Sequence, residues 1–380
     1  MIYTDVLVVG AGPAGLSAAA AAGAAGADVL ILERGHQPGG QLVKQTHMFF
    51  GSEKQYASYR GFEIADFLLE AACKLPNVTM QLNATVLAAY DDGVWTAEVS
   101  GKYIKIKPRA VITAAGASER SLVFPGNDLP GVYGAGAVQT LMNQYGVKPA
   151  KRVLMLGAGN IGLIVSYQLL QAGVEVAALI EGSPTIGGYL VHASKLRRMG
   201  VPILTSHTVK SARGSKSSNA NGQESSLERG LEHGLESVTT WRLDSNWQGI
   251  PGTEFTWPVD TLCIAVGLSP LAELLWQAGC KMVFVPELGG YVPYRDKYMA
   301  TSVPGVFAAG DSAGVEEASS AMVGGQLAGL SAAEYLGLQV SNEEKLDCLT
   351  QLEELRKGPA GARIRAGINK SLFEKEEPIC

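Results

Sequence analysis

The sequence predicts an α/β protein with two nested domains and a small β-meander insertion. Three observations predict it. A strand, a glycine-rich turn and an alanine-rich helix open the chain, and the same order of elements returns near its middle. Short alternating strands lie between the two copies. Because 380 residues exceed what one ordinary hydrophobic core supports, two domains are expected.

The first copy begins with a short apolar run of strand type at residues 5–9. Gly10, Gly12 and Gly15 follow with GxGxxG spacing, ahead of a helix that ends near Gly26. In this motif the first glycine permits a sharp turn, and the second lets backbone N–H groups approach a pyrophosphate. The third lets helix and strand pack closely. The spacing therefore predicts a phosphate site at a helix N-terminus.

A second apolar strand ends in Glu33, 18 residues after Gly15. A carboxylate at this place can accept hydrogen bonds from both hydroxyls of an adenosine ribose. A GxGxxG motif alone is weak evidence, but strand, helix and acid in register favour a Rossmann-like dinucleotide site over a simple glycine-rich turn. The residues assigned to this site are Gly10, Gly12, Pro13, Ala14, Gly15, Glu33 and Arg34.

The same pattern returns from a strand at 152–156 to Glu181. Gly10 and Glu33 are 23 residues apart, and Gly157 and Glu181 are 24 apart. Glu181 would repel the 2′-phosphate of NADP and can bind the free ribose of NAD, so NAD(H) is favoured over NADP(H). The residues assigned to this second site are Gly157, Gly159, Asn160, Ile161, Gly162 and Glu181.

Charge and composition argue against several classes of partner. The 31 Lys+Arg and 36 Asp+Glu give a net charge of −5 without a basic cluster, so nucleic acid is not an expected partner. The apolar opening stretch lacks a basic n-region, is interrupted by glycines and Pro13, and runs directly into Glu33. We expect a folded cytoplasmic protein with no membrane segment.

The cysteines are scattered, without a CxxC or any close pair. Their spacing supports neither a disulfide framework, nor a zinc site, nor an iron–sulfur cluster within this chain. We therefore expect separate reduced thiols and no metal. They are Cys73, Cys263, Cys280, Cys348 and Cys380.

Two stretches between the landmarks have their own character. Residues 78–107 alternate like a small antiparallel meander with turns at Asn83, Gly93 and Gly101. Residues 212–237 are rich in Ser, Asn, Gly and charge, which is typical of a surface loop or a disordered hairpin tip. We assign no chemistry to the second stretch.

Two Rossmann-like units about 147 residues apart, followed by a glycine–aspartate motif, resemble the two-dinucleotide-binding-domain flavoproteins of the pyridine nucleotide-disulfide oxidoreductase type. The resemblance implies FAD at the first unit and NAD(H) at the second. It also implies a discontinuous FAD domain, 1–116 plus 288–340, and an NAD(P) domain at 117–287 with the flexible insertion already described. A charged tail, 341–380, follows.

Three motifs carry the resemblance. Gly39-Gly40-Gln41-Leu42 resembles a turn that passes along FAD toward the isoalloxazine, and 111–118 resembles the crossing from the FAD domain to the NAD domain. Residues 301–311 resemble the late strand whose terminal aspartate binds the ribityl and pyrophosphate portion, and a helix near Glu317 would point its positive end at the pyrimidine ring. The further FAD residues implied are Gly40, Gln41, Val86, Ala115, Gly116, Gly310 and Asp311.

No cysteine pair stands where members of this family have one, so a dithiol mechanism is not expected. The polar stretch after Gln41 replaces it. Lys44 near the ring would stabilise reduced anionic flavin, and His47 could exchange a proton near neutral pH; the alternative is a loop that only shapes the pocket. Because a carboxylate there would oppose the helix dipole, Glu316 or Glu317 is expected to face a partner or substrate.

The chain is similar to α-type subunits of heteromeric sarcosine, opine and hydroxyproline dehydrogenases and of hydrogen cyanide synthase. The expected function is hydride transfer between NAD(H) and FAD, with electrons passed to or from a partner redox subunit, an iron–sulfur protein or a small-molecule substrate. The alternative is an electron-relay or dehydrogenase subunit of an amine or imino-acid dehydrogenase complex with a vestigial NAD site. A homodimer or hetero-oligomer is expected. Residues 341–380 are either a solvated tail or a partner-docking arm, and composition favours the tail.

Overall fold

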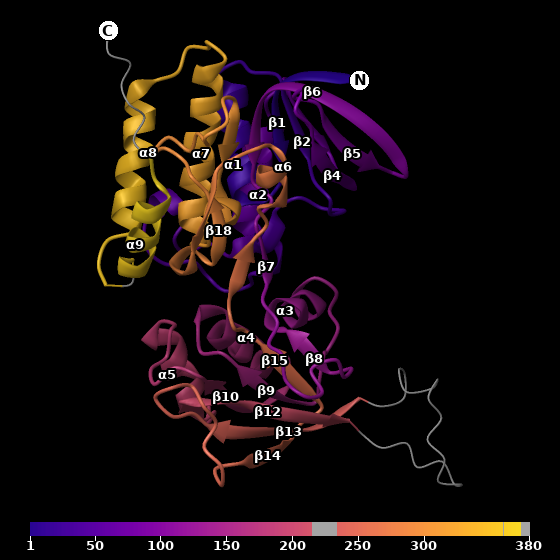
Figure 1. Cartoon of the computed structure of the whole chain (residues 1–380), viewed down its shortest axis with the longest axis vertical. Coiled ribbons are helices and arrows are strands. Elements are labelled where there is room, and N and C mark those ends of the chain that lie inside the picture. The colour runs from indigo at the N-terminus through magenta and orange to yellow at the C-terminus, as the bar shows by residue number, and fades with distance from the viewer. Residues whose placement is uncertain (215–233, 360, 374–380) are drawn as a thin grey trace. The chain divides into compact units, whose positions relative to one another are not determined.

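The chain folds into two compact units, each built on a parallel sheet with helices against it (Figure 1). Met1–Ser118 and Leu268–Cys380 form the first unit, and Glu119–Gly267 form the second. The expected α/β class with two Rossmann-like sheets is confirmed. This computed structural model describes residues 1–214, 234–359 and 361–373.

The sheet of the first unit is parallel at its centre and antiparallel at one side. The strands β3 (Val78–Gln81), β2 (Val29–Leu32), β1 (Ile2–Val9) and β6 (Lys102–Thr113) are parallel in this order, and β19 (Val306–Ala308) joins the end of β6 in parallel. The long strand β6 then pairs through its first half with β5 (Trp95–Val99), which pairs with β4 (Ala84–Ala89). β6 therefore belongs to both the parallel sheet and the meander.

The predicted meander at 78–107 is therefore only partly correct. Val29 of β2 pairs in parallel with Val78, so β3 extends the parallel sheet. Side chains alternate between partly buried and exposed along β3 because it is an edge strand with one covered face. That pattern is the same as the pattern of a meander strand, so alternation alone could not separate the two.

Helix α1 (Pro13–Ala24) packs between the sheet and two other helices, α2 (Gly61–Cys73) and α7 (Ala318–Tyr335). Its alanines let α7 approach closely. A Cβ on Gly325 would lie 2.1 Å from the Ala14 carbonyl oxygen, and one on Gly329 would lie 2.2 Å from the Ala18 oxygen. The two helix backbones are therefore in direct contact, and this contact holds α7 against α1.

The second unit repeats the design on a smaller sheet. Its parallel strands, in the order β11-β10-β9-β15-β8, are covered by α3 (Ala135–Asn143), α4 (Asn160–Gln171) and α5 (Leu190–Arg198). An antiparallel sheet of β12 (His207–Gly214), β13 (Leu235–Arg242) and β14 (Phe255–Pro258) accompanies it. The parallel strands are Ile203–Thr205, Glu175–Glu181, Arg152–Leu156, Thr261–Ile264 and Val132–Gly134.

The predicted insertion at 212–237 begins and ends inside regular strands. Ala212 to Gly214 lie in β12, Leu235 to Ser237 lie in β13, and Ala212 pairs with Val238. Ala212 and Leu235 are buried, which a surface loop would not allow. The centre of the predicted insertion, 215–233, lies outside the described residues.

The second unit ends at Gly267, 20 residues before the predicted boundary at 287. The segment that follows includes α6 (Glu273–Gln277), β17 (Met282–Val285) and β18 (Gly290–Pro293). Leu275 and Cys280 pack with Val306 and Ala308 of β19, so the segment belongs to the core of the first unit. The short strands β7 (Ala117–Glu119) and β16 (Leu268–Pro270) flank the two crossings of the chain.

The expected solvated tail at 341–380 is not what the described residues show. Helices α8 (Asn342–Leu355) and α9 (Ala362–Ser371) pack on the first unit, and Cys348 and Leu352 of α8 are buried in its main core beside α7. Charged residues are the largest class in α8, and its apolar residues form only a narrow stripe. The amino-acid composition of α8 therefore resembles that of a solvated tail although the helix packs on the core. Across the described ranges, no helix is both long and apolar enough to span a bilayer.

Gly325→Ala is expected to lower the free energy of unfolding by about 1–3 kcal/mol, because its Cβ must displace the backbone of α1. Gly324→Ala in the same helix is the matched control, since the nearest atom to its Cβ would be Met299 Cε at an ordinary 3.6 Å. Urea denaturation of the three proteins measures the difference. Equal midpoints for the two variants would contradict the backbone contact between α1 and α7.

Candidate functional site

The turn after β1 requires glycine at two positions for packing reasons. Gly10 has φ +99°, and a Cβ there would lie 2.5 Å from the Ala114 carbonyl oxygen. A Cβ on Gly15 would lie 1.9 Å from the Gly10 oxygen. These two glycines therefore let α1 begin directly against the ends of β1 and β6.

Gly12 between them is not explained by packing. It has an extended conformation that any residue adopts, and the nearest atom to an added Cβ would be Gly40 Cα at 3.9 Å. No side chain of the described residues caps α1, which starts with Pro13 at its first position. The first-turn N–H groups and the bare backbone at Gly12 thus form an open cradle of the kind that a pyrophosphate requires. A Cβ at Gly12 would narrow this cradle.

Glu33 is held beside this cradle by two backbone groups. Its Oε2 accepts from the Ala11 N–H at 2.8 Å and its Oε1 from the Gly35 N–H at 2.7 Å. Each carboxylate oxygen keeps a further lone pair, so a ribose hydroxyl can still donate to it. Arg34 next to it is exposed.

β4 begins against the same stretch. The Ala84 N–H donates to the Glu33 carbonyl at 2.9 Å, and the Asn83 N–H donates to the Gly35 carbonyl. Two residues further along, Val86 is partly buried and packs in the cluster that contains Leu32. The start of β4, and with it Val86, therefore lies close to the end of β2 that carries the acid.

The second unit has the same connections. A Cβ on Gly157, at φ +108°, would lie 2.2 Å from the Ala265 oxygen, and a Cβ on Gly162 would lie 2.0 Å from the Gly157 oxygen. Gly159 has nothing within 4 Å of an added Cβ. Glu181 accepts from the Ala158 N–H at 2.7 Å and from the Ser183 N–H at 2.8 Å. Asn160 and Ile161 form the first turn of α4.

Sequence reasoning missed a second pair of glycines. Gly187 and Gly188 follow Glu181 by six and seven residues, as Gly39 and Gly40 follow Glu33. The Gly188 N–H donates to the Ala158 oxygen at 2.9 Å, and the Gly39 N–H donates to the Ala11 oxygen at 2.7 Å. Both turns therefore fold over their glycine cradles. The equal spacing from the acid was the signal that could have found the second turn.

The loop after β19 closes the first site from the other side. Gly310 has φ +64°, and a Cβ on it would meet Ala14 Cβ at 2.8 Å, so this loop lies against the start of α1. Asp311 is partly buried, and Glu316 N–H donates to its Oδ1 at 3.3 Å. Desolvation by burial, with a smaller contribution from the charge of Glu316, raises the pKa of Asp311 to about 6.

The stretch expected to face the flavin forms a short 3₁₀ helix, Gly40–Lys44, that starts on the Gly12 cradle. Gln41 is exposed, and Lys44 and His47 are partly buried. The His47 ring stacks on Phe49 with centroids 5.6 Å apart, and Arg60 donates to the Thr46 carbonyl. The geometry orders this loop beside the first site, and a chemical role for Lys44 or His47 remains a prediction.

The structure also describes the crossing motif, 111–118, and the two acids that follow Asp311, Glu316 and Glu317. Ala115 and Gly116 follow β6, where the Gly116 carbonyl accepts from the Leu271 N–H at 2.9 Å. Glu317 is exposed. Glu316, by contrast, accepts two hydrogen bonds from Arg356, so it is not the group that faces a partner or substrate.

The four cysteines within the described residues are single thiols and form no redox pair. Cys263, Cys280 and Cys348 are buried and Cys73 is exposed, and none of these four is in a disulfide. Burial raises the pKa of the Cys348 thiol to about 11 and also raises the pKa of the Cys263 and Cys280 thiols. Within the described part of the chain, no three His, Cys, Asp or Glu side chains are grouped to hold a metal ion.

The chain belongs to the pyridine nucleotide-disulphide oxidoreductase family, whose pattern matches residues 4–325. It is thus a flavoprotein oxidoreductase of a family that binds FAD and NAD(P)H. The opine oxidase A-subunit of Agrobacterium tumefaciens is 30% identical over 87% of this chain and 65% of that protein. The sarcosine oxidase alpha-subunit of Rhizobium meliloti is 31% identical over 76% of this chain and 27% of that protein. The chain thus spans less than two thirds of both relatives.

Among solved structures, the thioredoxin reductase of T. acidophilum matches 88% of this chain and 99% of its own, with a TM-score of 0.69 and 23% identity. At this identity the match supports the fold alone. The family match by itself confirms the expected family, in a chain whose described residues have no cysteine pair.

Gly159→Ala is expected to leave the melting temperature within about 1 °C of the wild type and to weaken NADH binding at least roughly tenfold, because its Cβ enters the open cradle. Gly162→Ala is the packing control: its Cβ would meet the Gly157 oxygen, so it should lower the melting temperature by several degrees. Thermal denaturation and NADH titration separate the two effects. A Gly159→Ala protein that binds NADH normally would rule out this cradle as the site.

Asp311→Asn is expected to stabilise the FAD-free protein at pH 7.5 by about 1–2 kcal/mol while weakening FAD binding. A carboxyl whose pKa rises on folding binds more protons in the folded state, so the folded protein loses stability as pH rises from 3.8 to about 6. The gain from the substitution should vanish below pH 4. Urea denaturation of FAD-free protein across this range measures it, and a gain that is constant with pH would contradict the assignment.

Proposed function

We propose that this member of the pyridine nucleotide-disulphide oxidoreductase family binds FAD at the Gly10–Gly15 turn and NAD(H) at the Gly157–Gly162 turn. Hydride passes between the two cofactors, and electrons pass to or from a partner subunit or a small acceptor. No dithiol takes part. The observation that carries the proposal is the pair of open cradles, at Gly12 and Gly159, each beside a carboxylate held by two backbone N–H groups.

The residues fit the two dinucleotides. Gly12 and Gly159 are the glycines of the two turns that packing does not require, so a ligand that approaches the backbone is their best explanation. Glu33 and Glu181 are oriented acceptors for ribose hydroxyls. FAD, when bound, supplies the hydride chemistry, and this chain supplies position and electrostatics.

Glu181 supports NAD(H) over NADP(H). Both of its oxygens already accept backbone N–H groups, so the carboxylate is fixed where a 2′-phosphate would have to lie. The negative charges of the carboxylate and of a 2′-phosphate would repel each other there. The next residues, Gly182 and Ser183, bring no cation to offset the repulsion.

A second candidate function is a subunit of an amine or imino-acid oxidising complex in which the NAD site is vestigial. The matches to the opine oxidase and sarcosine oxidase proteins favour it, since both proteins are named as subunits. The lack of a cysteine pair in the described residues also fits a chain that gives its electrons to a partner. In this case a substrate amine, supplied with the partner subunit, would reduce the flavin and NADH would not.

Anaerobic titration of the purified flavoprotein with NADH is expected to bleach the flavin absorbance band, and NADPH is expected to do so at least about tenfold less effectively. Glu181→Ala should weaken reduction by NADH and narrow the difference between the two nucleotides. The Ser183→Ala protein is the matched control, since only the backbone of Ser183 contacts the carboxylate.

A flavin that stays oxidised with both nucleotides would contradict the reductase proposal. Reduction by an amine together with a partner subunit would then support the second candidate. Equal reduction by NADH and NADPH would contradict only the role of Glu181.

A further inference from the structure

Helix α8 ends in a buried ion pair beside the first site. Arg356, its C-cap residue, donates through Nε and Nη2 to the two carboxylate oxygens of Glu316, both at 2.8 Å. The side chains are 14% and 12% exposed, whereas each other ion pair of the described residues has at least one side chain that is 40% exposed or more. A two-pronged guanidinium–carboxylate contact fixes direction as well as distance.

A small cavity lies beside this pair. This cavity of about 10 Å³, lined by Gly310, Ser320, Glu316 and both Arg295 and Arg356, has room for about one water molecule. Arg295 is 3% exposed, its Nε has no hydrogen-bond partner in the described residues, and burial lowers its pKa to about 10. The charges of Glu316 and Asp296 both favour the charged form of Arg295, so Glu316 serves two guanidinium groups, those of Arg295 and Arg356.

Glu316 takes part in the hydrogen bonds that shape the loop before α7. Its N–H donates to Asp311 Oδ1, and the Gly314 N–H donates to the Asp311 carbonyl at 3.1 Å. Glu317, the next residue, is the N-cap of α7. A shift of Glu316 would therefore move both the Asp311 carboxylate and the first turn of the helix.

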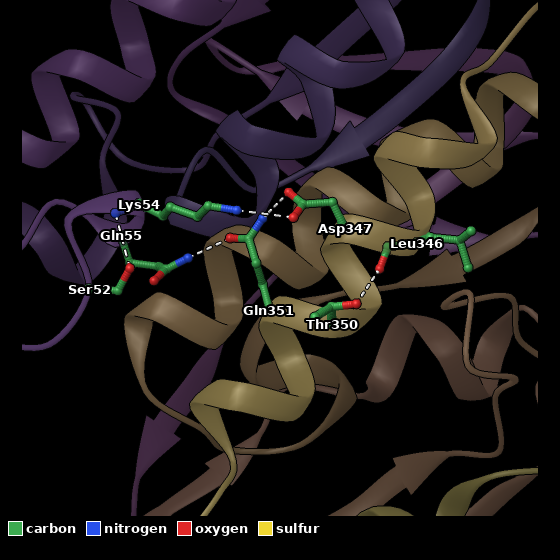
Figure 2. A network of polar contacts seen from close by, with 7 residues as sticks. All are labelled: Ser52, Lys54, Gln55, Leu346, Asp347, Thr350 and Gln351. Atoms are coloured by element: carbon green, nitrogen blue, oxygen red, sulfur yellow. Dashed lines mark hydrogen bonds and ion pairs between the residues drawn. The ribbon is translucent and has the colours of Figure 1, made fainter.

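A second contact holds α8 to the loop on the other side of the first site (Figure 2). Lys54 Nζ donates to Asp347 Oδ1 at 3.0 Å, and Gln55 Nε2 donates to Gln351 Oε1 at 2.5 Å. Lys54 and Gln55 follow the loop that contains His47. One helix thus contacts the two loops, 40–60 and 310–317, that border the cradle at Gly12.

We propose that Arg356 is a positioning residue of the FAD site: it holds Glu316, and through Glu316 it holds Asp311 and the first turn of α7 in the geometry that the cofactor needs. This inference rests on the proposed function. Arg356 lies beyond residue 325, where the family match ends.

Packing alone does not account for the pair. Cys348 and Leu352 already bury the apolar stripe of α8 against α7. Covering the core would need no buried charges, and desolvating a carboxylate and a guanidinium is costly unless both are well paired. The pair is therefore best explained by the loop that it fixes.

The test compares Arg356→Met with the double variant Arg356→Met/Glu316→Leu and with the control Lys54→Met. Hydrogen exchange of peptides that cover 310–325 reports on the loop, and the release of FAD on dilution of the purified flavoprotein reports on the site. Arg356→Met leaves Glu316 beside Asp311 without its partner, so exchange and FAD release should both rise roughly tenfold or more. The double variant leaves no unpaired carboxylate but still lacks the contact that fixes the loop, so exchange and FAD release should stay roughly threefold or more above wild type. Lys54→Met breaks an exposed pair and should change both quantities less than about twofold.

An Arg356→Met protein with wild-type exchange and FAD release would overturn the proposal. A double variant with wild-type exchange and FAD release would also overturn it, since an unpaired carboxylate alone would then explain the defect of the single variant. If Arg356→Met fails to fold, the double variant alone decides: exchange and FAD release that stay raised support the proposal, and wild-type values overturn it. A wild-type protein that holds no FAD would contradict the proposed function instead, and the exchange measurement would still decide whether Arg356 fixes the loop.

Discussion

Direct backbone contact, made possible by glycine, is the constraint on which this structure depends. Gly15 lets α1 begin against the Gly10 carbonyl, and Gly325 and Gly329 let α7 lie against the carbonyls of α1. The helix is therefore fixed on two sides, by the sheet and by α7. Because Gly310 rests on Ala14, the loop with Asp311 is brought to the same helix end. A phosphate cradle closed by residues from both ends of the chain follows from these contacts.

The duplication of this arrangement supports the proposal that one chain serves two dinucleotides. Both units use one glycine for the turn, one for helix packing and one that packing leaves open. Both hold an acid with two backbone N–H groups and cover the cradle with a Gly-Gly turn. The units differ in what surrounds the cradle: among the described residues, the aspartate loop and the helix α8 that contacts it through Arg356 belong to the first unit. The aspartate loop and α8 fit the proposal that the first unit retains FAD tightly, whereas NAD(H) exchanges at the second unit.

The sequence predicted the elements that follow local rules and missed those set by tertiary packing. The two βαβ units were predictable because glycine spacing, apolar strands and a terminal acid occur together within about 25 residues. The parallel pairing of β3 was not, since an edge strand and a meander strand alternate alike. Residues 268–287 could be assigned to the first unit only from their contacts with β19. The pairing of Glu316 with Arg356 was also not predictable from the sequence. The two residues are 40 positions apart, and Arg356 lies in a charged stretch for which composition predicts a solvated tail.

The central claim is that this chain holds two different dinucleotides at once, one in each unit. Native mass spectrometry of the purified flavoprotein with added NADH tests it most directly, because it counts each ligand on a single chain. The account predicts one FAD and one NADH per chain, with the FAD count unchanged as NADH is added. A chain that never carries more than one dinucleotide, or from which NADH displaces FAD, would contradict it.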